Sequence, residues 1–296
     1  MENFVFGIVT GSIILLGAVG FSMTLNSDHF VNVAHGQMLL LGAYLALYFS
    51  KLTGNFALGA IISVIMTGAL GMLFYAAVYR PIKTKGPLIL LFTSVGLSYF
   101  IWGIVGAVSG SQTQAYEIPA VRAIRVFGTP LITSYELTII LVAVIFAVSL
   151  HLFFAKTRQG KLIRAVADNH DLARIRGINP LRRALYVWFI ASGMAAMSGI
   201  FLGMISSIDL ELGWKQILII LSATVLGGLG STYGVMFAAI LIGLSMELGI
   251  LILPSHYRSA IAFAIIIIVL LVRPEGLKSV VPALRGRPVE SDMESL

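Results

Sequence analysis

Three polar side chains interrupt an apolar run near the start of the chain. Asn32, His35 and Gln37 stand in a stretch that otherwise holds apolar and small residues. Asn32 and His35 are three residues apart, which places them on one face of a helix. Polar groups inside a membrane are costly unless they meet a partner or a cavity. We therefore interpret these groups, with neighbouring Gly36 and Gly42, either as part of a translocation path or as hydrogen-bonding groups that hold helices together.

A second candidate feature is a break in the apolar segment 216–252. Gly227, Gly228 and Gly230 each cost a helix about 1 kcal/mol relative to alanine. Ser231 can cap a new half-helix and direct its positive dipole end inward. Discontinuous helices of this kind are typical of translocation pathways in transporters. The alternative is a tight turn between two crossings, in which glycine supplies only positive φ.

Motifs for catalysis or nucleotide binding do not occur. The glycine-rich break lacks the Gly-Lys-Ser/Thr of a phosphate-binding loop, and no His-Glu-x-x-His or Gly-x-Ser-x-Gly stands out. The chain contains no cysteine. Glu247 lies in an apolar run and could pair with Arg258 at a membrane edge. We expect no enzyme activity, and no cofactor or metal held by this chain.

The third feature is a basic segment between two long apolar runs. Its eight basic residues are Lys156, Arg158, Lys161, Arg164, Arg174, Arg176, Arg182 and Arg183. With Asp168 and Asp171 as the only acids, the segment holds +6 of the formal +7 charge. Basic loops of membrane proteins remain in the cytoplasm, so this loop fixes the orientation.

Within this loop, residues 171–176 are predicted to form a short capped helix. Asp168 or Asn169 is available as the N-cap. Gly177 is placed as the C′ residue, and Ile178 can make the hydrophobic contact of a Schellman motif. The ends of the helix are therefore encoded locally.

The apolar residues of this short helix are Leu172, Ala173 and Ile175. An exposed helix of this kind can enter a groove on a protein partner. The alternative is a basic patch that lies on anionic lipid. The caps and the apolar residues favour the protein partner.

The composition determines which elements must position these features. Residues are 58% hydrophobic and 11% charged, against roughly 25% charged in soluble domains. Spans are predicted at 4–25, 31–49, 56–79, 88–108, 137–154 and 185–208, followed by apolar runs at 216–252 and 260–272. We predict an all-α polytopic membrane protein with about eight to ten transmembrane helices, some of them discontinuous.

Loop charges predict the sidedness of the bundle. The loop 80–87 has three positive and no negative charges and belongs in the cytoplasm, whereas 209–215 is net acidic and belongs outside. The C-terminus is expected in the cytoplasm. The expected domain organisation is then a membrane domain at 1–276 and a cytoplasmic tail at 277–296.

Several motifs in order resemble one family. They are Asn32-Val-Ala-His-Gly36, Leu41-Gly-Ala-Tyr44, Tyr79-Arg-Pro81, Arg164-Ala-Val-Ala-Asp168, Gly177-Ile-Asn179, Leu226-Gly-Gly-Leu-Gly-Ser231 and Leu270–Pro274 with Gly276. Together they resemble the shorter of the two permease subunits of branched-chain amino-acid ABC importers. The resemblance extends from about residue 11 to residue 277.

The resemblance implies a multi-pass subunit of a bacterial-type inner (plasma) membrane. Its implied partners are a second homologous permease, two cytoplasmic ATPase subunits that bind the ATP, and a periplasmic solute-binding protein. The segment that would couple to the ATPase matches Arg164, Ala167, Asp168, Asp171, Leu172, Ala173, Ile175, Gly177 and Asn179. The chain would pass a small polar solute, namely branched-chain amino acids, into the cytoplasm.

Two alternatives remain at this point. The first motif reads Val-Asn-Val-Ala-His-Gly-Gln, where relatives have Ile-Asn-Phe-Ala-His-Gly and often an acid next. This departure leaves a urea or short-amide permease of the same family as an alternative. A stand-alone channel or ion-coupled carrier would need an intramembrane charge, for which Glu247 and His35 are the candidates.

Overall fold

The structure, a computed structural model, describes residues 2–119, 124–126, 129–168, 170–251, 254 and 258–272 of the chain. Its elements in order are α1 (Glu2–Asp28), α2 (Ala34–Thr53), α3 (Phe56–Phe74), the π-helix η1 (Tyr75–Tyr79), α4 (Arg80–Ile82), the 3-10 helix η2 (Lys83–Lys85), α5 (Pro87–Ser109), β1 (Ile124–Val126), β2 (Thr129–Ile132), α6 (Ser134–Lys156), α7 (Arg158–Asp168), α8 (His170–Ile175), α9 (Pro180–Ile205), α10 (Leu212–Gly227), α11 (Thr232–Gly249) and α12 (Arg258–Val272).

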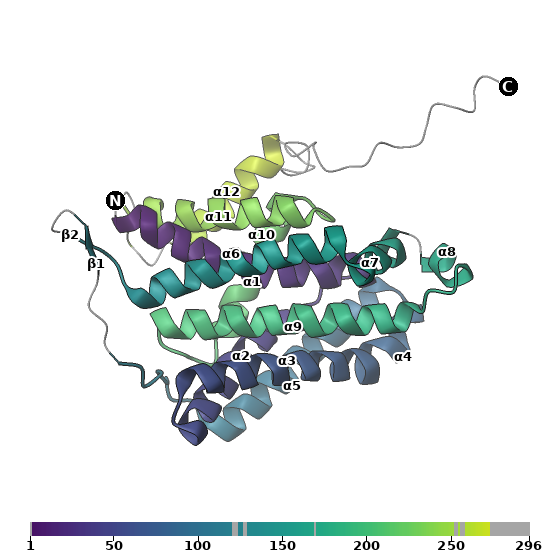
Figure 1. Cartoon of the computed structure of the whole chain (residues 1–296), viewed down its shortest axis with the longest axis horizontal. Coiled ribbons are helices and arrows are strands. Elements are labelled where there is room, and N and C mark those ends of the chain that lie inside the picture. The colour runs from purple at the N-terminus through teal and green to yellow at the C-terminus, as the bar shows by residue number, and fades with distance from the viewer. Residues whose placement is uncertain are drawn as a thin grey trace.

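The predicted all-α membrane architecture is confirmed. Among the described residues, six helices are long and apolar enough to cross a membrane: Glu2–Asp28, Phe56–Lys85, Pro87–Ser109, Ser134–Lys156, Pro180–Ile205 and Thr232–Gly249. The expected eight to ten crossings exceed these six. Of the other long helices, α10 and α12 have only 16 and 15 residues, whereas α2 has 20 residues and is not among the six. Strands β1 and β2 form a small antiparallel pair at one end of the bundle (Figure 1).

Helices α1 and α9 form the buried centre of the bundle. Their apolar spans are mostly buried, whereas α3, α5 and α6 turn most of their apolar residues outward, as lipid-facing helices do. Helix α1 packs antiparallel to α11, where a Cβ on Gly7 would lie 2.9 Å from Cα of Leu244 and one on Gly11 would lie 2.9 Å from Cα of Ile240. Small residues therefore permit close backbone contact between the central helices.

Two helices begin inside the bundle. Nε2 of His35, in the first turn of α2, lies 3.0 Å from the carbonyl oxygen of Gly17, halfway along α1. A Cβ on Gly36 would lie 2.5 Å from the carbonyl oxygen of Gly213, in the first turn of α10. The N-terminal turns of α2 and α10 thus meet in the interior, and the discontinuities of this fold precede these two helices.

The loop after α5 contacts both α2 and the segment between α9 and α10. The backbones of Gln114 and Ile208 pair, with N–O distances of 2.8 and 2.9 Å. The Tyr116 hydroxyl donates a 3.0 Å hydrogen bond to the carbonyl oxygen of Ala43. Burial raises the pKa of Tyr116, which keeps this hydroxyl protonated as a donor. The loop after α5 therefore covers the connection between α9 and α10.

Candidate translocation and coupling sites

The proposed coupling segment projects from one end of the bundle. Helices α7 and α8 lie together at that end, opposite β1 and β2 (Figure 1). The N–H of Gly177 bonds the carbonyl of Arg174 at 3.0 Å, and the N–H of Ile178 bonds that of Ala173 at 3.0 Å. Gly177 has φ +76°. These two bonds are the Schellman pattern, so the predicted C-terminal cap of α8 is confirmed.

The start of α8 removes one of the two predicted N-cap residues. Asp168 was expected to be available as an N-cap, but it is the last residue of α7. Asn169 and the side chains of Asp168 and Asp171 lie outside the described part of the chain. Because α8 begins at His170, the N-cap prediction rests on Asn169 and stays a prediction.

The apolar residues of α8 separate into a buried and an exposed set. Ala173 is 3% exposed, whereas Leu172 and Ile175 are 53% and 82% exposed. Ile175 thus presents an aliphatic side chain at the surface of the protein.

Other residues assigned to coupling connect α7 and α8 to the neighbouring helices or cap them. Arg164 Nη2 donates to the carbonyl oxygen of Phe154 at 2.6 Å, which ties α7 to the end of α6. The Asn179 side chain accepts from the N–H of Arg182 at 3.3 Å and caps α9. Ala167, in α7, is half-buried.

Two of the three polar residues at the start of α2 form hydrogen bonds with protein groups. Asn32 is 3% exposed, and its Oδ1 accepts from the Tyr79 hydroxyl at 3.0 Å. Nε2 of His35 must carry a proton to donate to Gly17. Gln37 differs from both, because neither amide atom has a hydrogen-bond partner among the described residues. These contacts fit the interpretation that Asn32 and His35 hold helices together.

The glycines assigned to the path are packing or turn positions. Gly42 lies against the backbone of Ala196, and Gly227 against that of Val235. Gly228 and Gly230 have φ of 89° and 93°. A Cβ on Gly230 would lie 3.9 Å from Asn26, in the last turn of α1. The break therefore lies at the α7 and α8 end of the bundle, and its geometry is that of a turn.

Ser231 performs the predicted capping role. Its hydroxyl oxygen accepts from the N–H of Gly234 at 3.1 Å, so Ser231 is the N-cap of α11. The structure does not bring this turn together with Asn32, His35, Gly36 and Gly42 around one described cavity. Their role in a path stays a prediction.

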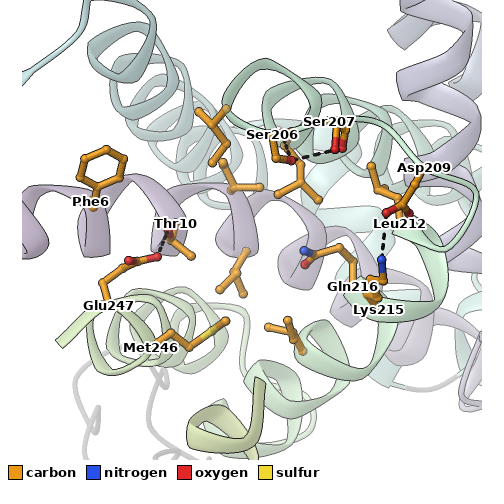
Figure 2. Close-up of a pocket in the computed structure, with 15 residues that line it drawn as sticks. Phe6, Thr10, Ser206, Ser207, Asp209, Leu212, Lys215, Gln216, Met246 and Glu247 are labelled. Atoms are coloured by element: carbon orange, nitrogen blue, oxygen red, sulfur yellow. Dashed lines mark hydrogen bonds and ion pairs between the residues drawn. The ribbon is translucent and has the colours of Figure 1, made fainter. Parts of the chain in front are cut away.

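A pocket of about 360 Å³ lies elsewhere, between α1, α10 and α11 (Figure 2). It is lined by Phe6, Thr10, Ile13, Ile14, Leu202, Ile205, Ser206, Ser207, Asp209, Leu212, Lys215, Gln216, Ile219, Met246 and Glu247. None of the residues predicted for the path is in this lining. From the sequence, residues 209–215 are recognisable only as a net acidic loop. That pattern does not predict that Asp209 and Lys215 line a pocket.

Two polar pairs mark opposite sides of this pocket, with Gln216 between them (Figure 2). Lys215 Nζ lies 2.9 Å from Asp209 Oδ2, and the Thr10 hydroxyl donates to Glu247 Oε1 at 3.0 Å. The side chain of Arg258, the predicted partner of Glu247, lies outside the described residues.

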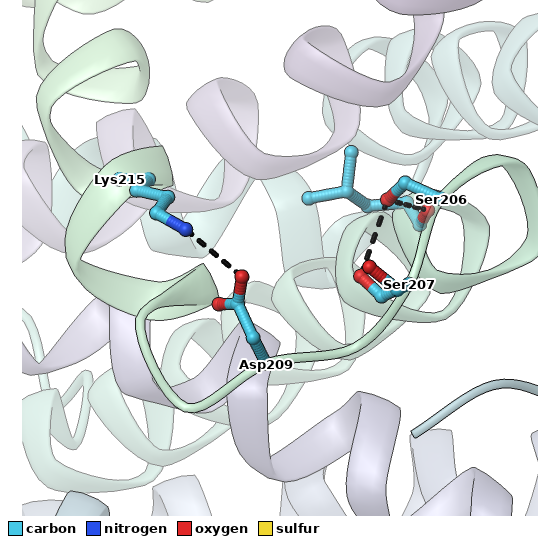
Figure 3. A network of polar contacts seen from close by, with 5 residues as sticks. Ser206, Ser207, Asp209 and Lys215 are labelled. Atoms are coloured by element: carbon cyan, nitrogen blue, oxygen red, sulfur yellow. Dashed lines mark hydrogen bonds and ion pairs between the residues drawn. The ribbon is translucent and has the colours of Figure 1, made fainter. Parts of the chain in front are cut away.

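Serines at the rim join the end of α9 to the following loop. The Ser206 hydroxyl donates to the carbonyl oxygen of Leu202 at 2.8 Å and contacts that of Ser207 at 3.4 Å (Figure 3). Figure 3 also shows the ion pair of Asp209 and Lys215 across the loop. The rim is therefore hydroxyl-rich and charged.

A buried carboxylate connects three elements at the other end. Asp28 accepts from Lys83 Nζ at 2.6 Å and from Trp188 Nε1 at 2.7 Å. Its side chain is 1% exposed. The sequence alone does not predict this site, because the partners of Asp28 are 55 and 160 residues away along the chain.

Comparisons with known proteins agree with this architecture. The family described as "Branched-chain amino acid transport system / permease component" matches residues 3–270. The chain is 29% identical to the high-affinity branched-chain amino acid transport system permease protein BraD of Pseudomonas aeruginosa, over 94% of this chain and 95% of BraD. It is also 29% identical to LivH of Escherichia coli K12, over 92% of both chains.

A solved structure has the same fold. PsaBC from Streptococcus pneumoniae, determined in complex with Fab, superposes with a TM-score of 0.51 and 12% sequence identity. The match covers 96% of both chains. At this identity the likeness concerns the fold alone.

Proposed function

The chain belongs to the family of permease components of branched-chain amino acid transport systems, and we propose that it conducts branched-chain amino acids inward as one subunit of an ATP-driven importer. It is a multi-pass membrane protein and a transport subunit, as its relatives are. The proposed partners are a second homologous permease, two cytoplasmic ATPases and a periplasmic binding protein. We place the chain in a bacterial inner membrane, with ATP bound by the ATPases.

The observation that carries this proposal is the capped helix α8. Its Schellman cap fixes a short helix that presents Ile175, which is 82% exposed, at the end of the bundle rich in basic residues. A protruding amphipathic helix of this kind suits a groove on a partner. Helix α8 ends at Ile175 and α9 starts at Pro180, so only a short linker separates them. A displacement of α8 by a partner would therefore move α9, which is one of the two central helices.

The relatives favour branched-chain amino acids over urea or short amides. BraD and LivH are both named for branched-chain amino acid transport, and the matches extend over 92–95% of the chains. The altered motif around Asn32 and Gln37 does not interrupt this similarity.

Uptake of labelled leucine and urea by cells that lack only this chain tests the proposal. We expect leucine uptake to disappear and to be restored by the intact chain and by Ile175→Leu. The variant Ile175→Asp should not restore it, because a charge replaces the apolar docking side chain. Loss of urea uptake alone would contradict the assignment of branched-chain amino acids as the substrate. Unchanged uptake of both leucine and urea would contradict the proposed transport function.

A further inference from the structure

We propose that the pocket between α1, α10 and α11 binds a free zwitterionic amino acid with an aliphatic side chain. This inference rests on the proposed function and assigns a binding site to it. The pocket measures about 360 Å³, within the range of roughly 300–1,000 Å³ that is usual for small-molecule sites.

The charged side of the pocket matches the two charges of such a ligand. Lys215 supplies a positive charge for the carboxylate, and Asp209 a negative charge for the ammonium group. Oδ2 of Asp209 contacts Lys215, while Oδ1 is buried without a hydrogen-bond partner in the described part of the chain. A buried acceptor of this kind gains from a charged donor.

The start of α10 favours the carboxylate at the same place. Glu211 is the N-cap, and its side chain makes no capping hydrogen bond within the described structure. The N–H of Leu212, the first residue of α10, donates to the carbonyl oxygen of Asp209 at 3.2 Å, so the helix start contributes its positive dipole end beside Lys215. Both effects act on the same end of the ligand.

The middle of the pocket is apolar. Ile13, Ile14, Leu202, Ile219 and Met246 line it together with Phe6. These side chains suit an aliphatic group. Glu247, on the far side, is 6% exposed and accepts a hydrogen bond from Thr10.

The position of the pocket suits entry from outside. It lies where α9 ends, and α8 precedes the other end of α9, 26 residues or about 39 Å away. Ser206 and Ser207 at its rim are exposed. The pocket therefore lies at the end of the bundle opposite the coupling segment.

Substrate protection of an introduced cysteine tests this assignment. The chain has no cysteine, so label on it reports the introduced residue alone. The assembled importer carrying Ser207→Cys would be treated with N-ethylmaleimide in proteoliposomes without the binding protein. Gln216→Cys serves as a second probe if Ser207→Cys does not assemble. Ser111→Cys, exposed in the loop after α5, is the control for general reactivity.

We expect leucine to slow labelling of Ser207→Cys and to leave Ser111→Cys unaffected. Leucine amide and 4-methylpentanoate each lack one of the two charges. They should need at least about tenfold higher concentrations, because a hydrogen bond to a charged group contributes roughly a decade of affinity. Equal protection by all three compounds would overturn the zwitterion assignment.

Charge-removing variants complete the test. In the Ser207→Cys background, Lys215→Met and Asp209→Asn should each raise the half-protecting leucine concentration by about tenfold or more. Lys51→Met should leave it unchanged, because Lys51 forms an exposed pair with Glu117, 3.9 Å away, outside the pocket lining.

The outcomes separate this inference from the proposed function. If the assembled importer takes up leucine but leucine never protects either probe, the pocket assignment fails and the proposed function stands. If cells lacking the chain take up leucine normally, the proposed function fails. Protection that survives both Lys215→Met and Asp209→Asn also overturns the assignment.

Discussion

The indole nitrogen of Trp188 donates a 2.7 Å hydrogen bond to Oδ2 of Asp28 and so joins α9 to the end of α1. Lys83 adds a 2.6 Å contact to Oδ1. Asp28 directly precedes the linker that leads to the interior start of α2, and α9 begins just after α8. This carboxylate therefore connects the coupling end of the bundle to the interior helix start.

Replacing Trp188 by Phe should destabilise the protein. The change leaves a buried carboxylate oxygen without its donor, which costs about 1.5–3 kcal/mol. Trp102→Phe is a matched control, because Trp102 Nε1 is buried without a hydrogen-bond partner among the described residues. Apparent melting temperatures of the purified complex in detergent measure the difference. Equal shifts for the two variants would show that the bond to Asp28 contributes nothing.

Removing the charge of Lys83 should have a larger effect. Lys83→Met leaves the 1%-exposed Asp28 side chain without its cation, and breaking a buried pair in this way costs about 3–5 kcal/mol. Lys85→Met, two residues away on the exposed side of η2, should be close to neutral. Adding Asp28→Asn to Lys83→Met should recover part of the stability. A Lys83→Met protein as stable as Lys85→Met would contradict this prediction.

Gly42→Ala should disturb the contact between α2 and α9. A Cβ at this position would overlap the backbone of Ala196, so the two helices would have to separate. Gly96→Ala in α5 is the control, because a Cβ there meets no described atom within 4 Å. Alanine at Gly96 should be neutral or stabilising by up to about 1 kcal/mol. Thermal stability of both variants checks this.

The outcome at Gly42 also bears on its role. If Gly42→Ala abolishes leucine uptake while thermal stability stays at the wild-type level, the residue lines a path rather than a packing contact. Loss of stability together with uptake fits packing alone.

Substitutions of Gly177 should follow its backbone conformation. At φ +76°, valine is strained by at least about 1–2 kcal/mol, while asparagine tolerates the left-handed region better. A Cβ on Gly177 would meet no described atom within 4 Å, so the strain arises from the backbone. We expect Gly177→Val to reduce leucine-stimulated ATP hydrolysis of the assembled importer and Gly177→Asn to retain most of it. The reverse order would contradict the conformational explanation.

Sequence alone determined the features that rest on local physics. Long apolar runs predicted the helices, because a bilayer demands about 20 apolar residues for each crossing. Gly177 and Ile178 predicted the Schellman cap of α8, since a cap depends on residues within one turn of the helix end. The ordered motifs around Asn32 and Gly227 predicted the family, which the match to residues 3–270 supports.

Tertiary structure decided every feature that depends on residues far apart in the chain. Asp28 finds Trp188 only when α1 and α9 pack side by side, and Thr10 meets Glu247 across 237 residues. The glycine-rich break reads as an intramembrane discontinuity, yet folding puts it at an end of the bundle, while α2 and α10 begin inside. Spacing along a sequence fixes which face of a helix a residue occupies, but the depth of a helix start and its partners come from packing.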